Sequence, residues 1–208
     1  MDGAAVYVES IGEPHFYTLA VVPIDVRKKI LKTDNVFTQE GEVERAIVTA
    51  MYAMMYEEEF ANLDAYLKKL VNENSVTGLR MEAVESVGGN RYSTPYYFVE
   101  YGEINKEAPL SLYLDNPNIT KVEIKTKLQD YFKPEKITIA VTLYMSEGDQ
   151  DPDGALYDKI ISDIKEMDNI PPGSYSLTLH DNLINAKVSN ASKASSINKT
   201  VMNKILKE

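Results

Sequence analysis

The sequence predicts an α+β fold, in which helices pack on one face of a mixed or mainly antiparallel sheet. Three observations lead to this prediction. Short segments rich in β-branched and aromatic residues alternate with longer amphipathic ones, in two successive strand-helix-strand units. Of the 208 residues, 44% are hydrophobic and 26% are charged, which is typical of a folded globular protein. No apolar run approaches the roughly 20 residues that a membrane-spanning helix needs.

The first predicted elements are strands. Residues 6–8 form a short strand, and residues 15–22 form a longer one with many aromatic and β-branched side chains. Residues 12–14, with the sequence Gly-Glu-Pro, supply the turn between them. Pro23 is expected to end the second strand, because proline has no backbone N–H to donate.

Residues 42–71 carry a helical pattern, with apolar residues at three- and four-residue spacing. Glu40, Glu42 and Glu44 lie near its start, where the helix dipole favours acids. The acidic residues 57–59 leave two interpretations open: a break between two helices, or the middle of one long helix.

The second half of the chain shows the clearest alternation. Its predicted elements are a strand at 95–101, a helix at 119–132, a strand at 137–144, a helix at 154–167 and a strand at 174–180. We expect the strands 15–22, 95–101, 137–144 and 174–180 to share one sheet, with the helices 42–71 and 154–167 on one face of it. The residues expected in the core are Leu19, Val21, Ile47, Met51, Leu63, Leu67, Ile139, Val141, Ile160, Ile164, Leu177 and Leu179.

The charge of the chain is unevenly distributed. The net charge is −10, but residues 185–208 hold five lysines and one acid, so residues 1–184 carry −14. We therefore predict a single globular domain over 1–184 and a basic, Asn- and Ser-rich tail over 185–208, helical near 196–206. The acidic domain argues against binding to nucleic acids and against lying flat on an anionic membrane.

Several kinds of catalytic site are excluded by residues that the sequence lacks. With no cysteine, there is no thiol nucleophile, disulfide or thiolate metal site. The sequence also has no glycine-rich phosphate loop and no Gly-x-Ser-x-Gly nucleophile motif. No cofactor is therefore expected. Acid runs such as residues 40–44 and 57–59 are more often solvated helix faces than catalytic carboxylate pairs.

Residues 149–154 are the one segment in which oxygen ligands are spaced as calcium requires. Asp149, Asp151 and Asp153, followed by Gly154, match the first half of an EF-hand loop. The position that should supply a bidentate glutamate is Ile160, so two ligand oxygens are missing. We therefore expect a strand-to-helix turn in which Asp151 or Asp153 caps the helix, with a calcium site as the alternative.

His15 and His180 are the only histidines, and both fall in predicted strands. If those strands were neighbours, the two side chains could bind zinc together with a carboxylate such as Glu13 or Asp181. The alternative is a partly buried imidazole that is hydrogen-bonded to backbone or hydroxyl groups.

Tyr92, Tyr96, Tyr97 and Tyr101 form an aromatic segment together with Phe98. A tyrosine combines an apolar ring with a polar tip, which suits the recognition of a peptide or glycan. A central strand that is buried on both faces would have the same composition, so that alternative stays open.

Several phrases along the chain are similar to those of one family: residues 6–10 (VYVES), 12–17 (GEPHFY), 22–25 (VPID), 38–44 (TQEGEVE), 94–97 (TPYY) and 170–176 (IPPGSYS). On these phrases, the chain resembles a family of staphylococcal (Gram-positive) lipoproteins of unknown function, from Val6 to Asn185. The resemblance implies export, removal of a signal peptide and attachment of a lipid to a cysteine. That cysteine is absent from this sequence, so the chain would be the ectodomain of a lipoprotein at the cell surface. The family brings no known catalytic residues.

We therefore expect an extracytoplasmic, non-enzymatic binding module, held at the membrane only by a lipid anchor, whose partner is a cell-surface protein, peptide or glycan. The alternative is a hydrolase whose site is assembled from dispersed carboxylates and a histidine. A histidine within hydrogen-bond reach of a carboxylate in a deep pocket would favour the hydrolase. Exposed side chains at Tyr92, Tyr96 or Tyr101 would favour the binding module.

Overall fold

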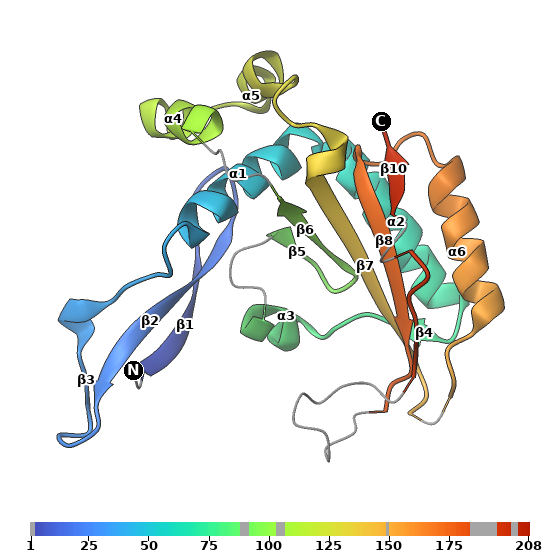
Figure 1. Ribbon diagram of the computed structural model, residues 1–208, viewed down its shortest axis with the longest axis horizontal. Coiled ribbons are helices and arrows are strands. Elements are labelled where there is room, and N and C mark those ends of the chain that lie inside the picture. The colour runs from blue at the N-terminus through green and yellow to red at the C-terminus, as the bar shows by residue number, and fades with distance from the viewer. Residues whose placement is uncertain (1–2, 88–91, 103–106, 149, 184–194, 201–203) are drawn as a thin grey trace. The chain divides into compact units, whose positions relative to one another are not determined.

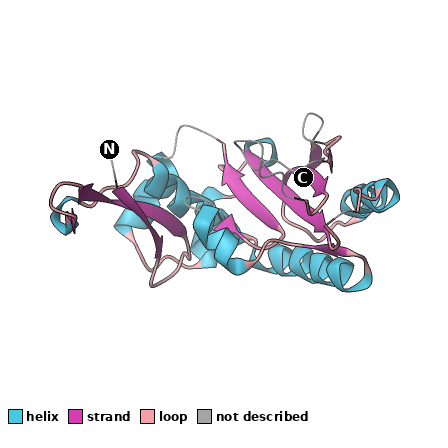
Figure 2. Ribbon diagram, turned by 90° about the horizontal axis from the view of Figure 1, so that it is seen from below, coloured by secondary structure: helices cyan, strands magenta, loops and turns pink. Residues whose placement is uncertain are grey.

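The computed structural model describes residues 3–87, 92–102, 107–148, 150–183, 195–200 and 204–208 (Figure 1). The chain forms two compact units. The first comprises Met1–Met55, Glu82–Tyr92 and Glu103–Tyr131, and the second comprises Tyr56–Met81, Ser93–Gly102 and Phe132–Glu208. Both units contain helices and strands (Figure 2), so the predicted α+β class is confirmed. The single domain predicted over residues 1–184 stays a prediction.

The sheet of the first unit has three antiparallel strands in the order β1-β2-β3. Strand β1 (Gly3–Glu9) pairs along its whole length with β2 (Tyr17–Asp25), and β3 (Ile30–Leu31) pairs with the end of β2. The register places Gly3 opposite Pro23. Strand β2 continues past Pro23, where it was expected to end, because the carbonyl of Pro23 still accepts the N–H of Lys32 at 2.8 Å.

The expectation that residues 15–22 share a sheet with 95–101, 137–144 and 174–180 was wrong. These residues contribute to β2, whose partners are β1 and β3. Strand β1 lies just before β2 in the chain, so their pairing closes a short loop at a small entropic cost. The face of β2 that is buried also differs from the predicted one. Thr18 and Ala20 are buried, whereas Leu19 and Val21, which were expected in the core, are partly exposed. The other ten residues expected in the core are buried.

Helices α1 (Glu42–Met55), α3 (Met81–Val87), α4 (Glu107–Asp115) and α5 (Lys121–Leu128) complete the described part of the first unit, with a short 3-10 turn η1 (Thr33–Asn35). Residues 46–53 and 55 of α1 are buried, and α1 contacts β2, α4 and α5. Helix α5 begins with a capping box. The Thr120 hydroxyl accepts the N–H of Glu123 at 3.3 Å, and the Glu123 carboxylate accepts the N–H of Thr120 at 2.9 Å.

The sheet of the second unit has seven strands: β10-β8-β7-β6-β5 in order, with β4 beside β7 and β9 beside β8. Strands β7 and β8 are parallel neighbours, connected through helix α6 (Gly154–Glu166), as parallel neighbours require. The prediction that 137–144 and 174–180 share a sheet is therefore confirmed. The seven strands are β4 (Val76–Thr77), β5 (Tyr92–Ser93), β6 (Tyr97–Tyr101), β7 (Ile137–Met145), β8 (Gly173–His180), β9 (Ser196–Ile197) and β10 (Ile205–Lys207), and a 3-10 turn η2 (Pro134–Lys136) precedes β7.

One face of this sheet forms the core of the second unit. Helix α2 (Glu57–Glu73) packs on it through Phe60, whose ring stacks on that of Tyr97 with 5.8 Å between the centroids. Helix α6 lies beside α2, and the Tyr66 hydroxyl of α2 donates to the Asp163 carboxylate of α6 at 2.8 Å. Full burial of a large apolar side chain contributes about 1.5–3 kcal/mol. The buried residues of β7 are Ile137, Ile139, Val141, Leu143 and Met145.

Residues 42–71 form parts of two helices and not one. Helix α1 ends at Met55, and Tyr56 leaves the helical conformation with φ −112° and ψ 33°. Glu57, Glu58 and Glu59 then occupy the first turn of α2, where the helix dipole favours acids. The acid run therefore starts a helix, and α1 belongs to the first unit whereas α2 belongs to the second.

The described part of the C-terminal segment is not helical and is not a detached tail. Strands β9 and β10 both pair antiparallel with β8. The helix expected near 196–206 was wrong because pairing with the edge of β8 outweighs a weak local helical pattern. Among the helices of the described ranges, none is long and apolar enough to cross a membrane.

Candidate functional site

The second face of the seven-stranded sheet carries polar and aromatic side chains that are partly exposed. We term it the open face; its residues are Phe98, Glu100, Thr138, Ala140, Thr142, Tyr144, Thr178 and His180. The strand register aligns them in rows, with Thr142 beside Thr178 and Tyr144 beside His180. Successive side chains of a strand point to opposite faces, so the alternation that builds the core also builds the open face.

Tyr144 and His180 are the aromatic pair of the open face. Their rings are stacked, with 5.3 Å between the centroids and an interplanar angle of 19°. Burial raises the pKa of the Tyr144 hydroxyl above its ordinary value. The hydroxyl is therefore protonated at neutral pH and can donate a hydrogen bond. His180 was a predicted site residue and Tyr144 was not, although the alternation of residues 137–144 already placed it opposite the core.

A cation and a fixed aromatic ring lie beside the hydroxyl rows. The Lys204 Nζ donates to the Thr138 Oγ1 at 2.8 Å, which places a positive charge next to the open face. The N–H of Thr142 donates to the carbonyl of Tyr96 at 2.8 Å. A Cβ added to Gly78 would lie 2.7 Å from the Tyr96 ring and 2.5 Å from the Pro95 carbonyl. Only glycine fits there, and its backbone supports the Tyr96 ring directly.

The structure separates the four tyrosines predicted to bind a partner. Tyr97 and Tyr101 are 2% and 1% exposed, so their side chains cannot contact a partner and their predicted role was wrong. Tyr101 packs edge-on against Phe132, with 5.8 Å between the centroids. The reason is alternation, since the odd-numbered residues of β6 point into the core. Tyr92 and Tyr96 are partly exposed, and their role stays a prediction.

His15 does meet a carboxylate, but at the surface. Its Nε2 lies 2.6 Å from the Glu9 Oε1, and the two side chains are 38% and 56% exposed. Its ring also contacts Tyr17 edge-on, with 4.8 Å between the centroids. Glu13, a proposed zinc ligand, accepts the backbone N–H of His15 at 3.1 Å. Water competes freely for such an exposed pair, so it lacks the enclosure that hydrolytic chemistry requires.

The two histidines of the proposed zinc site belong to different compact units. His15 lies in the first unit, and His180 lies on β8 of the second. Asp181 is buried, and its carboxylate accepts the N–H of Ser195 at 2.7 Å. Within the described ranges, no group of three or more histidines or acids is placed to hold a metal ion.

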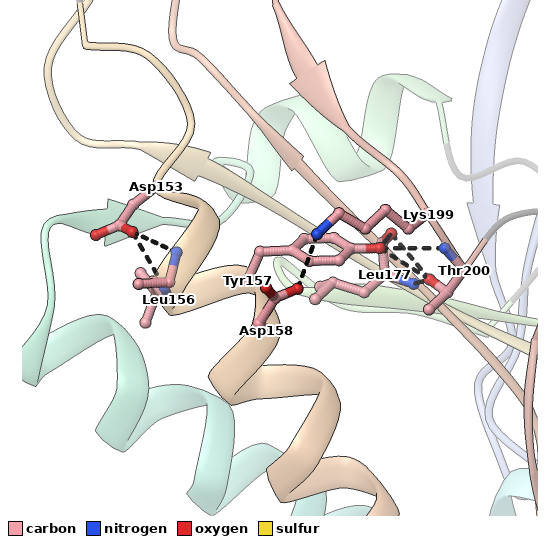
Figure 3. A network of polar contacts seen from close by, with 8 residues as sticks. Asp153, Leu156, Tyr157, Asp158, Leu177, Lys199 and Thr200 are labelled. Atoms are coloured by element: carbon pink, nitrogen blue, oxygen red, sulfur yellow. Dashed lines mark hydrogen bonds and ion pairs between the residues drawn. The ribbon is translucent and has the colours of Figure 1, made fainter.

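The aspartate-rich turn caps a helix. The Asp153 Oδ1 accepts the N–H groups of Ala155 and Leu156 at 2.8 and 3.1 Å, which defines the start of α6 (Figure 3). Of the two candidates for the cap, the structure selects Asp153 over Asp151, because Asp153 accepts these two hydrogen bonds. Asp149 lies outside the described residues, so calcium binding by Asp149, Asp151 and Asp153 stays an untested alternative.

A buried polar network fastens the C-terminal segment to β8 (Figure 3). The Thr200 Oγ1 accepts the N–H of Leu177 at 2.7 Å and lies 3.2 Å from the Leu177 carbonyl. The Tyr157 hydroxyl of α6 accepts the N–H of Thr200 at 3.1 Å and donates to the Leu177 carbonyl at 3.3 Å. Lys199 pairs with Asp158 at 2.9 Å on the exposed side. Thr200 thus occupies the edge of β8 between β9 and β10. Its hydroxyl makes the hydrogen bond to the Leu177 N–H that the backbone of a neighbouring strand would otherwise make.

Comparisons with known proteins give a family and a fold. A family model described as a protein of unknown function (DUF1672) matches residues 1–207. A search of curated proteins found no match. The crystal structure of a DUF1672 family protein from Staphylococcus aureus subsp. aureus Mu50 is similar, with a TM-score of 0.66 and 17% sequence identity, over 95% of this chain and 76% of that chain. At this identity, the likeness shows the fold alone.

Proposed function

The chain belongs to the DUF1672 family of proteins of unknown function, and from this premise we propose that it is a non-enzymatic binding module that acts outside the cell. Its phrases resemble those of staphylococcal lipoproteins, and a protein from Staphylococcus aureus shares its fold. On this proposal, a lipid on a cysteine ahead of the sequence anchors the protein to the membrane. The folded part then binds a cell-surface protein, peptide or glycan.

The open face is the observation that carries the proposal. The aligned hydroxyls of Thr142 and Thr178 can each donate and accept hydrogen bonds. Next to them, the Tyr144–His180 pair offers a flat aromatic surface with a polar tip. An extended polar chain, such as a peptide strand or a glycan, can form hydrogen bonds with these hydroxyls and pack against the aromatic pair at the same time.

The hydrolase alternative receives less support from the geometry. Its best candidate, the His15–Glu9 pair, has the short distance that acid–base catalysis needs. Both side chains are nevertheless open to solvent, and His180 stacks on Tyr144 in the other unit. We therefore assign the pair a structural role in linking the end of β1 to the start of β2.

The proposal can be tested by site-specific photocrosslinking. A photoreactive phenylalanine analogue at Thr178 of the full-length protein, displayed on bacterial cells, is expected to give a discrete adduct. The same analogue at Lys68, on the exposed side of α2, is the matched control and should give none. Tyr144→Ala should reduce the Thr178 adduct. Equal adducts from both positions, or none from Thr178, would contradict the assignment of the open face.

The anchor is tested separately. Lipid labelling and fractionation of cells that express the full-length protein should place it in the membrane fraction. Blocking lipoprotein processing should prevent the labelling. A protein that stays unlabelled and is found in the cytosol would refute the extracytoplasmic part of the proposal and leave the open face as a binding surface.

A further inference from the structure

The segment that follows β2, which comprises the connecting loop, β3 and Lys32, combines cations with exposed aliphatic side chains. The pairing of Asp25 with Ile30 closes the loop between β2 and β3 (Figure 1). Residues 26–32 are all exposed. We term this segment the basic loop; its cations are Arg27, Lys28, Lys29 and Lys32, and its aliphatic residues are Val26, Ile30 and Leu31. The aliphatic side chains are 60%, 52% and 54% exposed. Within the described residues, no acid forms an ion pair with any of the four cations.

The charge of the basic loop opposes that of the chain around it. Residues 1–184 carry −14 in total, and the basic loop contributes +4, so the other residues of this range carry −18. An overall acidic protein is repelled by an anionic surface, but screening limits this repulsion to about 8 Å at physiological salt. A loop at the end of a hairpin can therefore approach an anionic surface while the acidic body stays in solvent.

The backbone of the basic loop forms a defined turn at its lysines. Lys29 has φ 53°, in the left-handed region that favours glycine. The N–H of Lys28 donates to the Asp25 carboxylate at 3.0 Å, which fixes the turn just before it. Glycine at position 29 would relieve the backbone, yet the position holds a lysine.

We propose that the basic loop binds anionic phospholipid membranes. The four cations would contact the lipid phosphates, and Val26, Ile30 and Leu31 would enter the boundary between headgroups and acyl chains. A soluble polyanion would use the cations and leave the aliphatic side chains without a role. A stable protein–protein interface buries about 800 Å² per partner, which is more than a loop of this length offers.

The position of the basic loop agrees with the anchor proposed above. Gly3 of β1 pairs with Pro23 of β2, two residues before Asp25 at the base of the loop. A lipid attached ahead of this strand would therefore hold the basic loop close to the bilayer. This orientation rests on the proposed function, whereas the binding of the loop to lipid does not.

Vesicle binding by the unlipidated chain tests the proposal without the anchor. Vesicles of phosphatidylcholine and phosphatidylglycerol in equal parts should co-sediment the protein, and vesicles of phosphatidylcholine alone should not. Replacing Lys28, Lys29 and Lys32 by glutamine should weaken binding about a hundredfold, since each cation near the surface contributes a few-fold. The matched control replaces three exposed lysines elsewhere, Lys68, Lys125 and Lys133, by glutamine and should bind nearly as the wild type.

Insertion of the aliphatic side chains has its own readout, because the chain contains no tryptophan. Leu31→Trp should show a blue-shifted emission when anionic vesicles are added. Leu114→Trp, at another exposed leucine, should show no shift. Ile30→Ser combined with Leu31→Ser should weaken vesicle binding without lowering the melting temperature, because both side chains are exposed.

Three results would overturn the proposal: equal loss of binding in the lysine control, unchanged binding of the double serine variant, or binding to inorganic polyphosphate but not to vesicles. None of these results depends on the open face. The glutamine variant of the basic loop, expressed with its lipid anchor, should keep the Thr178 photocrosslink. Failure of the vesicle experiment and failure of the crosslinking experiment are therefore distinguishable.

Discussion

Replacing Thr200 by valine should loosen the C-terminal segment from β8. Valine has nearly the shape of threonine, so the change removes the hydroxyl and preserves the packing. Thr200 is 7% exposed and Leu177 is 1% exposed. The N–H of Leu177, which donates to the Thr200 Oγ1 at 2.7 Å, would then be buried without an acceptor. A buried donor left in this state costs about 1–3 kcal/mol.

We therefore expect a loss of about 2 kcal/mol in unfolding free energy for Thr200→Val. For a chain of this length, this corresponds to a decrease of roughly 4–8 °C in melting temperature. The same loss should raise the hydrogen-exchange rate of the Leu177 amide about thirtyfold, if exchange occurs through opening of this edge. Urea unfolding measures the first quantity, and exchange monitored by NMR measures the second.

Two further variants make the reasoning refutable. Thr200→Ser keeps the hydroxyl and should stay within about 1 kcal/mol of the wild type. Tyr157→Phe removes the other hydroxyl of the network, and its effect should not be additive with that of Thr200→Val, because both hydroxyls contact the Leu177 carbonyl. If the valine and serine variants are equally stable and equally protected at Leu177, the hydroxyl does not hold the segment.

The remaining predictions concern helix α6. Asp153→Ala should cost about 0.5–2 kcal/mol in urea unfolding because it removes the cap, whereas the matched control Asp151→Ala should cost almost nothing. Millimolar calcium should leave the melting temperature unchanged, and a rise that Asp151→Ala abolishes would instead reveal a calcium site. Burial raises the pKa of Asp163, but hydrogen bonds from Lys159 and Tyr66 outweigh it and hold the pKa below its ordinary value. The stabilisation from this carboxylate is thus present above the unfolded pKa, near 4, and is lost as the pH falls through the lower folded pKa. Tyr66→Phe should cost about 1–2 kcal/mol at pH 7, with the difference shrinking in unfolding experiments below about pH 4; a difference that is independent of pH would contradict this assignment.

Elements with a strong local pattern were predictable from the sequence. The alternation from Ile137 to Tyr144 predicted strand β7 and the face that it buries. The periodic apolar residues of α6 predicted the helix, and its burial of Ile160 and Ile164 followed from their spacing. The same pattern already contained the open face, because Thr142 and Tyr144 alternate with the core residues.

Elements that depend on distant pairing were not predictable. Strands β9 and β10 contain two and three residues, too few to show a periodicity, and they exist because β8 offers an edge to pair with. The prediction that Leu19 and Val21 are buried was wrong. Both faces of β2 carry apolar residues, so the sequence pattern does not decide which face is buried. The break at Tyr56 depends on backbone angles that no local residue preference dictates.

The closure of β8 by the C-terminal segment has a consequence for the order of events during synthesis. Strand β8 carries Tyr175, Leu177 and Leu179, all buried, and within the described part of the chain one of its edges is covered by residues that come later. While the chain is being made, that edge stays open after β7, α6 and β8 have already emerged. At an uncovered strand edge, strands of other chains can pair incorrectly. The C-terminal residues prevent this by covering the edge, but they are synthesised last. On the export proposed above, a sheet that cannot be completed early would also keep the chain competent to cross a membrane unfolded.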